Sequence, residues 1–193
     1  MTLRSALLAA AAAAAPFLAV PTASASHFDE GFDALASGTL TPFTDEGIAF
    51  SSPTDPGAFY VGNTGGLFSS LSGNALYASS ITGSSLTITL PAPDNNISLT
   101  FAIGDLLGLG GSDTLSYATN TGATGSITAA VPAGYLFPEG TLAYTGPNFT
   151  SITLTSPTYQ FAVDNIVATP EPASLGLLGL GVAGFAGLRR RRA

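Results

Sequence analysis

Ser85-Leu86-Thr87-Ile88-Thr89-Leu90 alternates polar and apolar side chains at every step. Ile97-Ser98-Leu99-Thr100-Phe101-Ala102-Ile103 repeats the pattern, and so does Ile152-Thr153-Leu154-Thr155. Successive side chains of a β-strand point to opposite faces, so a period of two is typical of strands that bury one face. Each of the three stretches therefore predicts a half-buried strand.

Shorter apolar stretches around these three predict further strands. They span residues 47–51, 59–61, 75–79, 114–118, 125–131, 141–144 and 160–168. Clusters of Gly, Pro, Asn and Asp separate them and predict turns, for example at 55–57 and 91–96. Many short strands with regular turns indicate an all-β fold, and we favour an antiparallel β-sandwich of jelly-roll type.

The last predicted strand changes its parity part of the way along. Phe161 and Val163 share one parity, whereas Ile166 has the other. A β-bulge at Asp164-Asn165 would restore the apolar register, because a bulge inserts one extra residue into a strand.

The first 25 residues have the order of a secretory signal peptide. Met1-Thr2-Leu3-Arg4 is a short basic region, residues 6–20 are an apolar run, and Ala23-Ser24-Ala25 fits a signal peptidase site. We therefore expect signal peptidase to release a mature chain that begins at Ser26.

The C-terminus has a second ordered set of features. Pro170-Glu171-Pro172 precedes an apolar segment at 175–188, and Arg189-Arg190-Arg191-Arg192 follows it. As a helix the segment is roughly 21 Å long at ~1.5 Å per residue, whereas a hydrocarbon core is about 30 Å thick. It is therefore short for a permanent membrane span, and the arginines predict a cytoplasmic end.

This order of residues resembles the PEP-CTERM sorting signal of exported bacterial proteins. The resemblance implies that an exosortase recognises Pro170, Glu171 and Pro172, and that the hydrophobic tail is then removed. It also implies transfer to the cell surface or to the extracellular polysaccharide matrix of a biofilm. We expect residues 1–25 to be the signal peptide, 26–168 the β-sandwich domain and 169–193 the sorting signal, which would contact the membrane only before processing. A plain single-span anchor is the alternative.

The charges of the predicted mature domain are of one sign. All five basic residues of the chain are Arg4 and Arg189–Arg192, so residues 26–172 contain neither Lys nor Arg. Nucleic-acid binding is excluded for such a domain, because neutralising phosphates needs cations. Metal cations are the natural counter-charge for its acidic residues.

A second, shorter resemblance concerns the domain itself. Residues 32–39 and 45–50 look like the first two strands of exported jelly-roll domains, and residues 149–154 and 161–166 look like their last two strands. Such domains resemble carbohydrate-binding modules and often hold a structural calcium where the first and last strands meet.

That resemblance gives a candidate calcium site. Its side chains are Asp33, Asp45, Glu46, Asp164 and Asn165, which supply the oxygen ligands that Ca²⁺ prefers. In the alternative, Asp164 only caps the predicted bulge by accepting hydrogen bonds from backbone N–H groups.

Sugar binding is a further candidate activity. The candidate residues are Tyr60, Tyr77, Tyr117, Tyr135, Tyr144, Tyr159, Asn63, Asn74, Asn95, Asn96 and Asn120. Hydrolysis of glycosides is a weaker candidate, because twelve acidic residues make some carboxylate pair inevitable. His27 is the only histidine and lies at the expected mature N-terminus, where a Ser-His-Asp site would not be held rigidly.

These observations predict an exported protein that is not an enzyme. The first hypothesis is a structural or adhesive β-sandwich of the cell surface or extracellular matrix. The second is a calcium-dependent carbohydrate-binding module that contacts extracellular polysaccharide, and the third is a secreted hydrolase.

Overall fold

The structure is a computed structural model that describes residues 28–53, 57–79, 84–109, 113–157 and 160–168. The predicted signal peptide, His27 and the sorting tail lie outside these residues. Across the described ranges there is no helix with the length and apolar character that crossing a membrane requires.

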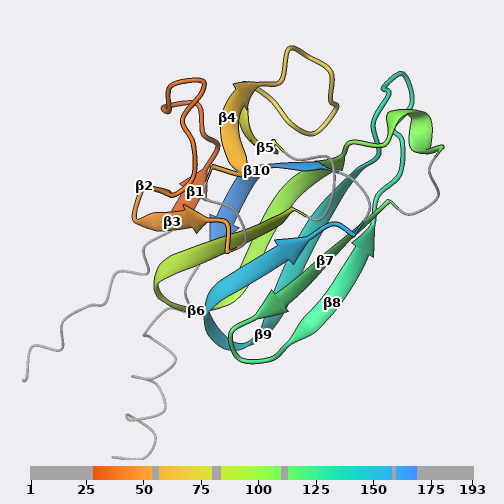
Figure 1. The fold of residues 1–193 in the computed structure, drawn as a ribbon. Helices are drawn as coiled ribbons and strands as arrows, with labels where there is room; N and C mark the ends of the chain where they lie inside the picture. The colour runs from red at the N-terminus through yellow and green to blue at the C-terminus, as the bar shows by residue number, and fades with distance from the viewer. Residues whose placement is uncertain (1–27, 54–56, 80–83, 110–112, 158–159, 169–193) are drawn as a thin grey trace, which may run out of the picture.

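The described residues form strands and a single 3-10 turn (Figure 1). In chain order they are β1 (Phe28–Glu30), β2 (Phe43–Asp45), β3 (Ile48–Ser51), β4 (Phe59–Asn63), β5 (Asn74–Ala78), β6 (Ser85–Ile103), the 3-10 turn η1 (Leu106–Gly108), β7 (Thr114–Thr119), β8 (Thr124–Thr128), β9 (Glu139–Thr155) and β10 (Phe161–Ala168). The all-β prediction is confirmed.

All of the strand pairs are antiparallel and join into one sheet. The strand order is β4-β5-β10-β6-β9-β7-β8, with β1 beside β10, and with β3 between β2 and β6. Neighbours in this order are often distant in the chain, so the fold depends on long-range pairing.

The two longest strands, β6 and β9, run through both halves of the sheet. The beginning of β6 pairs with the end of β9, and its last part pairs with the beginning of β9 and with β10. Register shifts between Thr89, Asp94 and Asn96 mark the bend of β6. In Figure 1 both strands curve across the molecule, so that the two halves enclose a shared core as in a β-sandwich.

The turn predicted at residues 91–96 is wrong, because β6 continues through them. Pro91 and Pro93 lack the N–H that a regular ladder needs, and proline in a strand is confined to edges and bulges. Both prolines lie in the stretch where the register shifts, so a bent strand accommodates them without a reversal of the chain.

The apolar positions of the alternating stretches form the core, as predicted. Buried side chains of β6 come from both sides of the bend, and they are Leu86, Ile88, Leu90, Ile97, Leu99, Phe101 and Ile103. Phenylalanines fill the space between them. Phe32 packs edge-on against Phe50 at 5.2 Å between ring centroids, and Phe59 packs against Phe161 at 5.3 Å.

The resemblance to jelly-roll strands is wrong for residues 32–39, and for residues 45–50 it holds only from Ile48, where β3 begins. Phe32 has φ 58°, and its carbonyl accepts a hydrogen bond from the Leu35 N–H at 3.0 Å, so the chain turns there instead of extending. Residues 45–50 hold a tight turn between β2 and β3, with Glu46 at φ 45°. Such left-handed positions match the twist of a two-residue hairpin.

Candidate functional site

One half of the sheet has a second apolar layer on the face that points away from the core. Phe101 and Phe161 face the core, so their neighbours Ala102 and Ala162 face outward, where they pair across β6 and β10. Both alanines are buried beneath a separate cluster that includes Leu71, Phe68 and Tyr77. The outer face is therefore covered by side chains, and it has its own packing.

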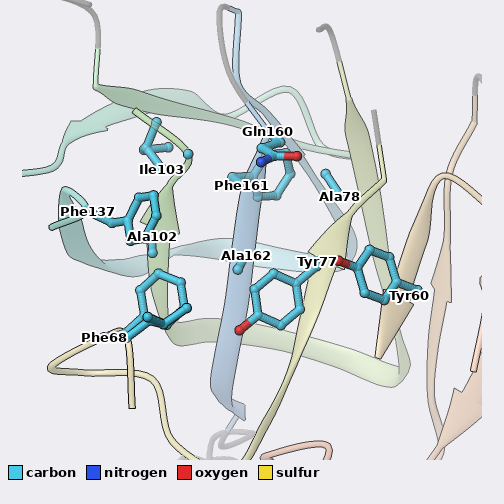
Figure 2. A pocket seen from close by; sticks show the side chains of 12 residues that line it. Tyr60, Phe68, Tyr77, Ala78, Ala102, Ile103, Phe137, Gln160, Phe161 and Ala162 are labelled. Atoms are coloured by element: carbon cyan, nitrogen blue, oxygen red, sulfur yellow. The ribbon is translucent and has the colours of Figure 1, made fainter. Parts of the chain in front are cut away.

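A cavity of about 210 Å³ lies on this outer face. We call it the tyrosine pocket and define it by Tyr60, Phe68, Tyr77, Ala102, Phe137, Gln160 and Ala162, which are among the residues that line it. Figure 2 shows the two alanines on the strands between two aromatic walls, with Gln160 at one end. Small side chains at the floor leave the space that the larger ones surround.

Each wall of the tyrosine pocket is a pair of aromatic rings. Tyr60 and Tyr77 are direct partners on β4 and β5, and their rings stack at 5.7 Å with an interplanar angle of 22°. Phe68 and Phe137 form the other wall, with ring centroids 5.4 Å apart, and Phe68 also contacts Tyr77 at 6.2 Å, so the two walls meet there. Ring pairs at such distances attract each other, so each wall is held partly by its own packing.

Burial changes the chemistry of one wall. Burial raises the pKa of Tyr77 to about 12, with smaller contributions from Tyr60 and from the negative charge of Asp164. The Tyr77 hydroxyl therefore keeps its proton at any physiological pH, and it remains able to donate a hydrogen bond.

The polar end of the pocket depends on a close backbone approach. Gly104 donates its N–H to the Gln160 carbonyl at 2.7 Å. A Cβ at position 104 would lie 2.5 Å from the Gln160 Cγ, so only glycine allows the glutamine to lie across the end of β6. The Gln160 side chain is exposed and offers both donors and an acceptor.

Hydrogen bonds to a buried carboxylate hold the loop 64–73, which carries Phe68, against the sheet. Glu139 accepts hydrogen bonds from the backbone N–H groups of Ser69 and Ser70, both at 2.7 Å. The Ser70 hydroxyl bonds the same carboxylate. Two successive amides thus hold a charge that would otherwise be costly to bury.

Asp164 provides a second hydrogen-bond contact that holds the loop 64–73. Its Oδ2 accepts a hydrogen bond from the Ser72 N–H at 3.0 Å, and its Oδ1 accepts one from the Asn165 N–H at 2.8 Å. Burial raises the pKa of the Asp164 carboxyl to about 6; the two N–H donors act against this rise, and the charge of Asp33 adds to it.

The predicted bulge at Asp164-Asn165 is confirmed. The register of β10 against β6 shifts between Asp164 and Val167, and Asn165 has φ 51°. The Asn165 amide donates to the Ser70 carbonyl at 3.2 Å, so the bulge also aims a side chain at the loop. The capping role that was the alternative for Asp164 is the one the geometry displays.

The five predicted calcium ligands lie in two places. Asp33 accepts a hydrogen bond from the Asn74 N–H at 2.7 Å, and its charge is close enough to raise the pKa of Asp164, which Asn165 follows in the bulge. Asp45 and Glu46 lie at the turn between β2 and β3, where the Asp45 side chain accepts from the Glu46 N–H. Among the described residues, no three acidic or histidine side chains gather into a metal-binding group.

Of the predicted sugar-binding tyrosines in the described part of the chain, Tyr60 and Tyr77 line the tyrosine pocket and the others do not. Tyr144 belongs to the core and packs edge-on against Tyr117 at 5.7 Å between ring centroids. Tyr135 is exposed outside the pocket lining, and Tyr159 lies outside the described residues. The predicted asparagines serve the backbone and one another: Asn120 accepts from the Thr150 N–H, and Asn63 pairs with Asn74.

A carboxylate pair, Asp105 and Asp113, lies outside the lining of the tyrosine pocket. Burial raises the pKa of the Asp113 carboxyl, and the charge of Asp105 and a hydrogen bond to it add to this rise. Neither residue lines the pocket, whose lining in the described part of the chain contains no acidic side chain.

The comparisons with known proteins identify the C-terminal tail. Residues 168–192 match the model of the PEP-CTERM protein-sorting motif, so the chain carries this motif as predicted. The motif implies export, sorting to the surface and processing by an exosortase. No curated protein matches the sequence.

Several solved structures are similar to this chain at low sequence identity. The K2 cleaved adhesin domain of Lys-gingipain is 10% identical, covers 75% of this chain and 98% of its own, and has a TM-score of 0.50. A family 29 carbohydrate binding module is 10% identical, with 76% and 89% coverage and a TM-score of 0.41. A second module, TmCBM61 in complex with β-1,4-galactotriose, has 12% identity, 74% and 95% coverage, and a TM-score of 0.40. The first of these likenesses shows a shared β-sandwich fold and no more.

Proposed function

We propose that this PEP-CTERM chain is an exported, non-enzymatic β-sandwich with a structural or adhesive role at the cell surface or in the extracellular matrix. The observation that carries the proposal is the sorting motif at residues 168–192, directly after a sheet whose last strand ends at Ala168. The finer assignment to the jelly-roll type belongs to the same proposal.

Removal of the C-terminal tail would change the charge of the protein. Removal of the tail near Pro170-Glu171-Pro172 separates Arg189–Arg192 from a domain that has acidic residues but neither Lys nor Arg. Before cleavage, the segment 175–188 would hold the chain at the membrane with its arginines on the cytoplasmic side. The released domain suits a hydrated matrix that contains cations.

Sorting is tested by changing the motif in the full chain. Replacement of Pro170, Glu171 and Pro172 by alanine should leave the protein in the cell envelope with its tail attached, as immunoblots of cell-surface and membrane fractions would reveal. Pro53→Ala, an exposed proline outside the motif, is the matched control and should be sorted normally. Normal surface delivery of the triple variant would overturn the sorting proposal.

A second candidate function is carbohydrate binding, and the tyrosine pocket is the observation that favours it. Aromatic walls with a few polar groups are typical of small-molecule sites. Hydrolysis of a glycosidic bond needs two carboxyl groups about 5–10 Å apart, and the lining of the pocket supplies none. We therefore assign binding to the pocket in preference to hydrolysis.

Calcium dependence belongs to this second candidate. Asp33 and Asp164 bring two carboxylates near the backbone of residues 72–74, and Asn165 adds an amide next to them. Ca²⁺ takes six to eight oxygens, so carbonyl groups and water would complete such a site.

A further inference from the structure

The tyrosine pocket has the size of a site for one ring. Its volume of about 210 Å³ is below the roughly 300–1,000 Å³ of sites that enclose drug-sized ligands. The floor is narrow, because Ala102 and Ala162 are direct partners on neighbouring strands. The two aromatic walls meet where Phe68 contacts Tyr77, so a ligand on this floor is a single compact group that lies beside that contact.

The walls suit the apolar face of a sugar ring. A pyranose presents C–H groups on its faces and hydroxyl groups around its edge. Aromatic rings of both walls line the pocket, with Phe68 in contact with Tyr77 at 6.2 Å between ring centroids, and Gln160 offers amide donors and an acceptor at one end of the same space (Figure 2). The lining thus matches a ligand that is apolar on its faces and polar at its edge.

The pocket is built before a ligand arrives. The tyrosine wall lies on paired strands, and the phenylalanine wall is fixed through the bonds of Ser69 and Ser70 to the buried carboxylate of Glu139. A preformed site avoids much of the entropy lost when side chains and loops become ordered on binding.

The charge of the domain selects an uncharged ligand. Residues 26–172 contain neither Lys nor Arg, so a uronate or sulfate group would find no such partner there. Glu139 and Asp164 accept hydrogen bonds from the loop 64–73, so they place negative charge next to the loop that carries Phe68. An anionic sugar would therefore be repelled, whereas a neutral sugar would not.

We propose that the tyrosine pocket binds one neutral sugar ring of an extracellular polysaccharide. This inference rests on the second candidate function and specifies its site and its ligand class. Tyr77 supplies the ring face, and Gln160 supplies the polar contact.

The test is affinity electrophoresis of the full-length chain in gels that contain dextran, mannan, galactan or hydroxyethyl cellulose, with alginate as the anionic polymer. We expect at least one neutral polymer to retard the protein and alginate not to retard it. Tyr77→Ala should weaken the retardation about tenfold, because it removes both buried area and a ring contact. Gln160→Ala changes an exposed side chain, so it tests the pocket without disturbing the core.

Tyr135→Ala is the matched control, because Tyr135 is an exposed tyrosine outside the lining, and it should bind as the wild type does. Absence of retardation by every neutral polymer, unchanged binding by both pocket variants, or equal retardation by alginate would overturn the inference. Surface delivery of the same variants is measured in parallel. Normal delivery with no neutral-polymer binding would sink the pocket inference alone, whereas failed delivery of the wild type would sink the surface role.

Discussion

Glu139 is the residue on which one wall of the tyrosine pocket depends most directly. It is 8% exposed and accepts from two successive backbone amides in the loop 64–73. A carboxylate in this position is acceptor-only, which suits two N–H donors that approach side by side. No local sequence pattern predicts this role, because Glu139 and its partner Ser69 are 70 positions apart in the chain.

Glu139→Gln should destabilise the protein by about 1–3 kcal/mol, because the new amide turns an N–H₂ group toward a backbone N–H and leaves a buried donor unpaired. The free energy of unfolding in urea measures the change. Glu46→Gln, at an exposed turn, should stay within about 0.5 kcal/mol of the wild type. Equal losses of unfolding free energy in the two variants would contradict the role of Glu139 in holding the loop 64–73.

Asp164 should make stability depend on pH. Its pKa is raised from 3.8 in the unfolded chain to about 6 in the folded protein, mainly by burial, so the folded state favours the protonated form. The contribution of this group is therefore fully present below pH 3.8 and is lost as the pH rises through 6.

The measurement compares urea unfolding of wild type and Asp164→Asn from pH 4 to pH 7.5 in a buffer with chelator. The stability of the wild type relative to the variant should fall across this range. If the difference in unfolding free energy between wild type and Asp164→Asn stays constant with pH, the N–H donors cancel the effect of burial on the pKa of Asp164. If that difference rises with pH, the donors outweigh burial. Either result would contradict the prediction.

At the scale of elements, the strands with a strict period of two were predictable, and the connections between their ends were not. Residues 85–90 and 97–103 alternate cleanly because β6 buries one face on each side of its bend, whereas residues 91–93 within the bend are exposed. The prolines at 91 and 93 indicate a turn in local terms. They lie in a bend because β9 pairs with β6 on both sides of it, and this tertiary pairing is invisible in the local sequence.

The failure at residues 32–39 has a similar cause. Phe32 is fully buried against Phe50, so its side chain behaves as the strand prediction requires. Its backbone is left-handed, however, and a phenylalanine gives no sign of this in the sequence.

The two faces of β6 should differ sharply in their tolerance of substitution. Ile88→Ala should cost about 2–5 kcal/mol, because it leaves a cavity in the core between the sheet halves. Thr89→Ala, one position later on the exposed face, should cost less than about 0.5 kcal/mol. Thermal or urea unfolding of both variants checks this, and similar costs would mean that the register of β6 is different.

At the scale of the whole molecule, the sequence indicates the destination better than it indicates the site. The tail was predictable because its order of Pro-Glu-Pro, apolar segment and arginines is local and specific. The tyrosine pocket was only partly predictable: Tyr60 and Tyr77 were among the candidates, whereas Phe68, Phe137 and Gln160 were not. Those three come from loops or strand ends that only the folded sheet brings together.

The acidic residues of the domain have no Lys or Arg as counter-charge, so a bound calcium ion is a testable source of positive charge. If Asp33 and Asp164 hold Ca²⁺, then adding EDTA should lower the melting temperature and Asp164→Asn should abolish that response. A metal that binds only the folded state raises the free energy of unfolding by RT ln(1 + L/Kd), where L is the free metal concentration, so its removal lowers stability. No shift with EDTA and no calcium uptake would remove the metal from the account.

The mass of the protein recovered from the cell surface shows directly whether both ends of the chain have been removed. We expect a chain that begins at Ser26 and ends near Pro170-Glu171-Pro172, without the segment 175–188 or the four arginines. Intact-mass spectrometry of the surface fraction, with the membrane fraction as reference, gives both ends in one measurement. Surface protein that still carries Arg189–Arg192, or protein confined to the membrane fraction, would contradict this expectation.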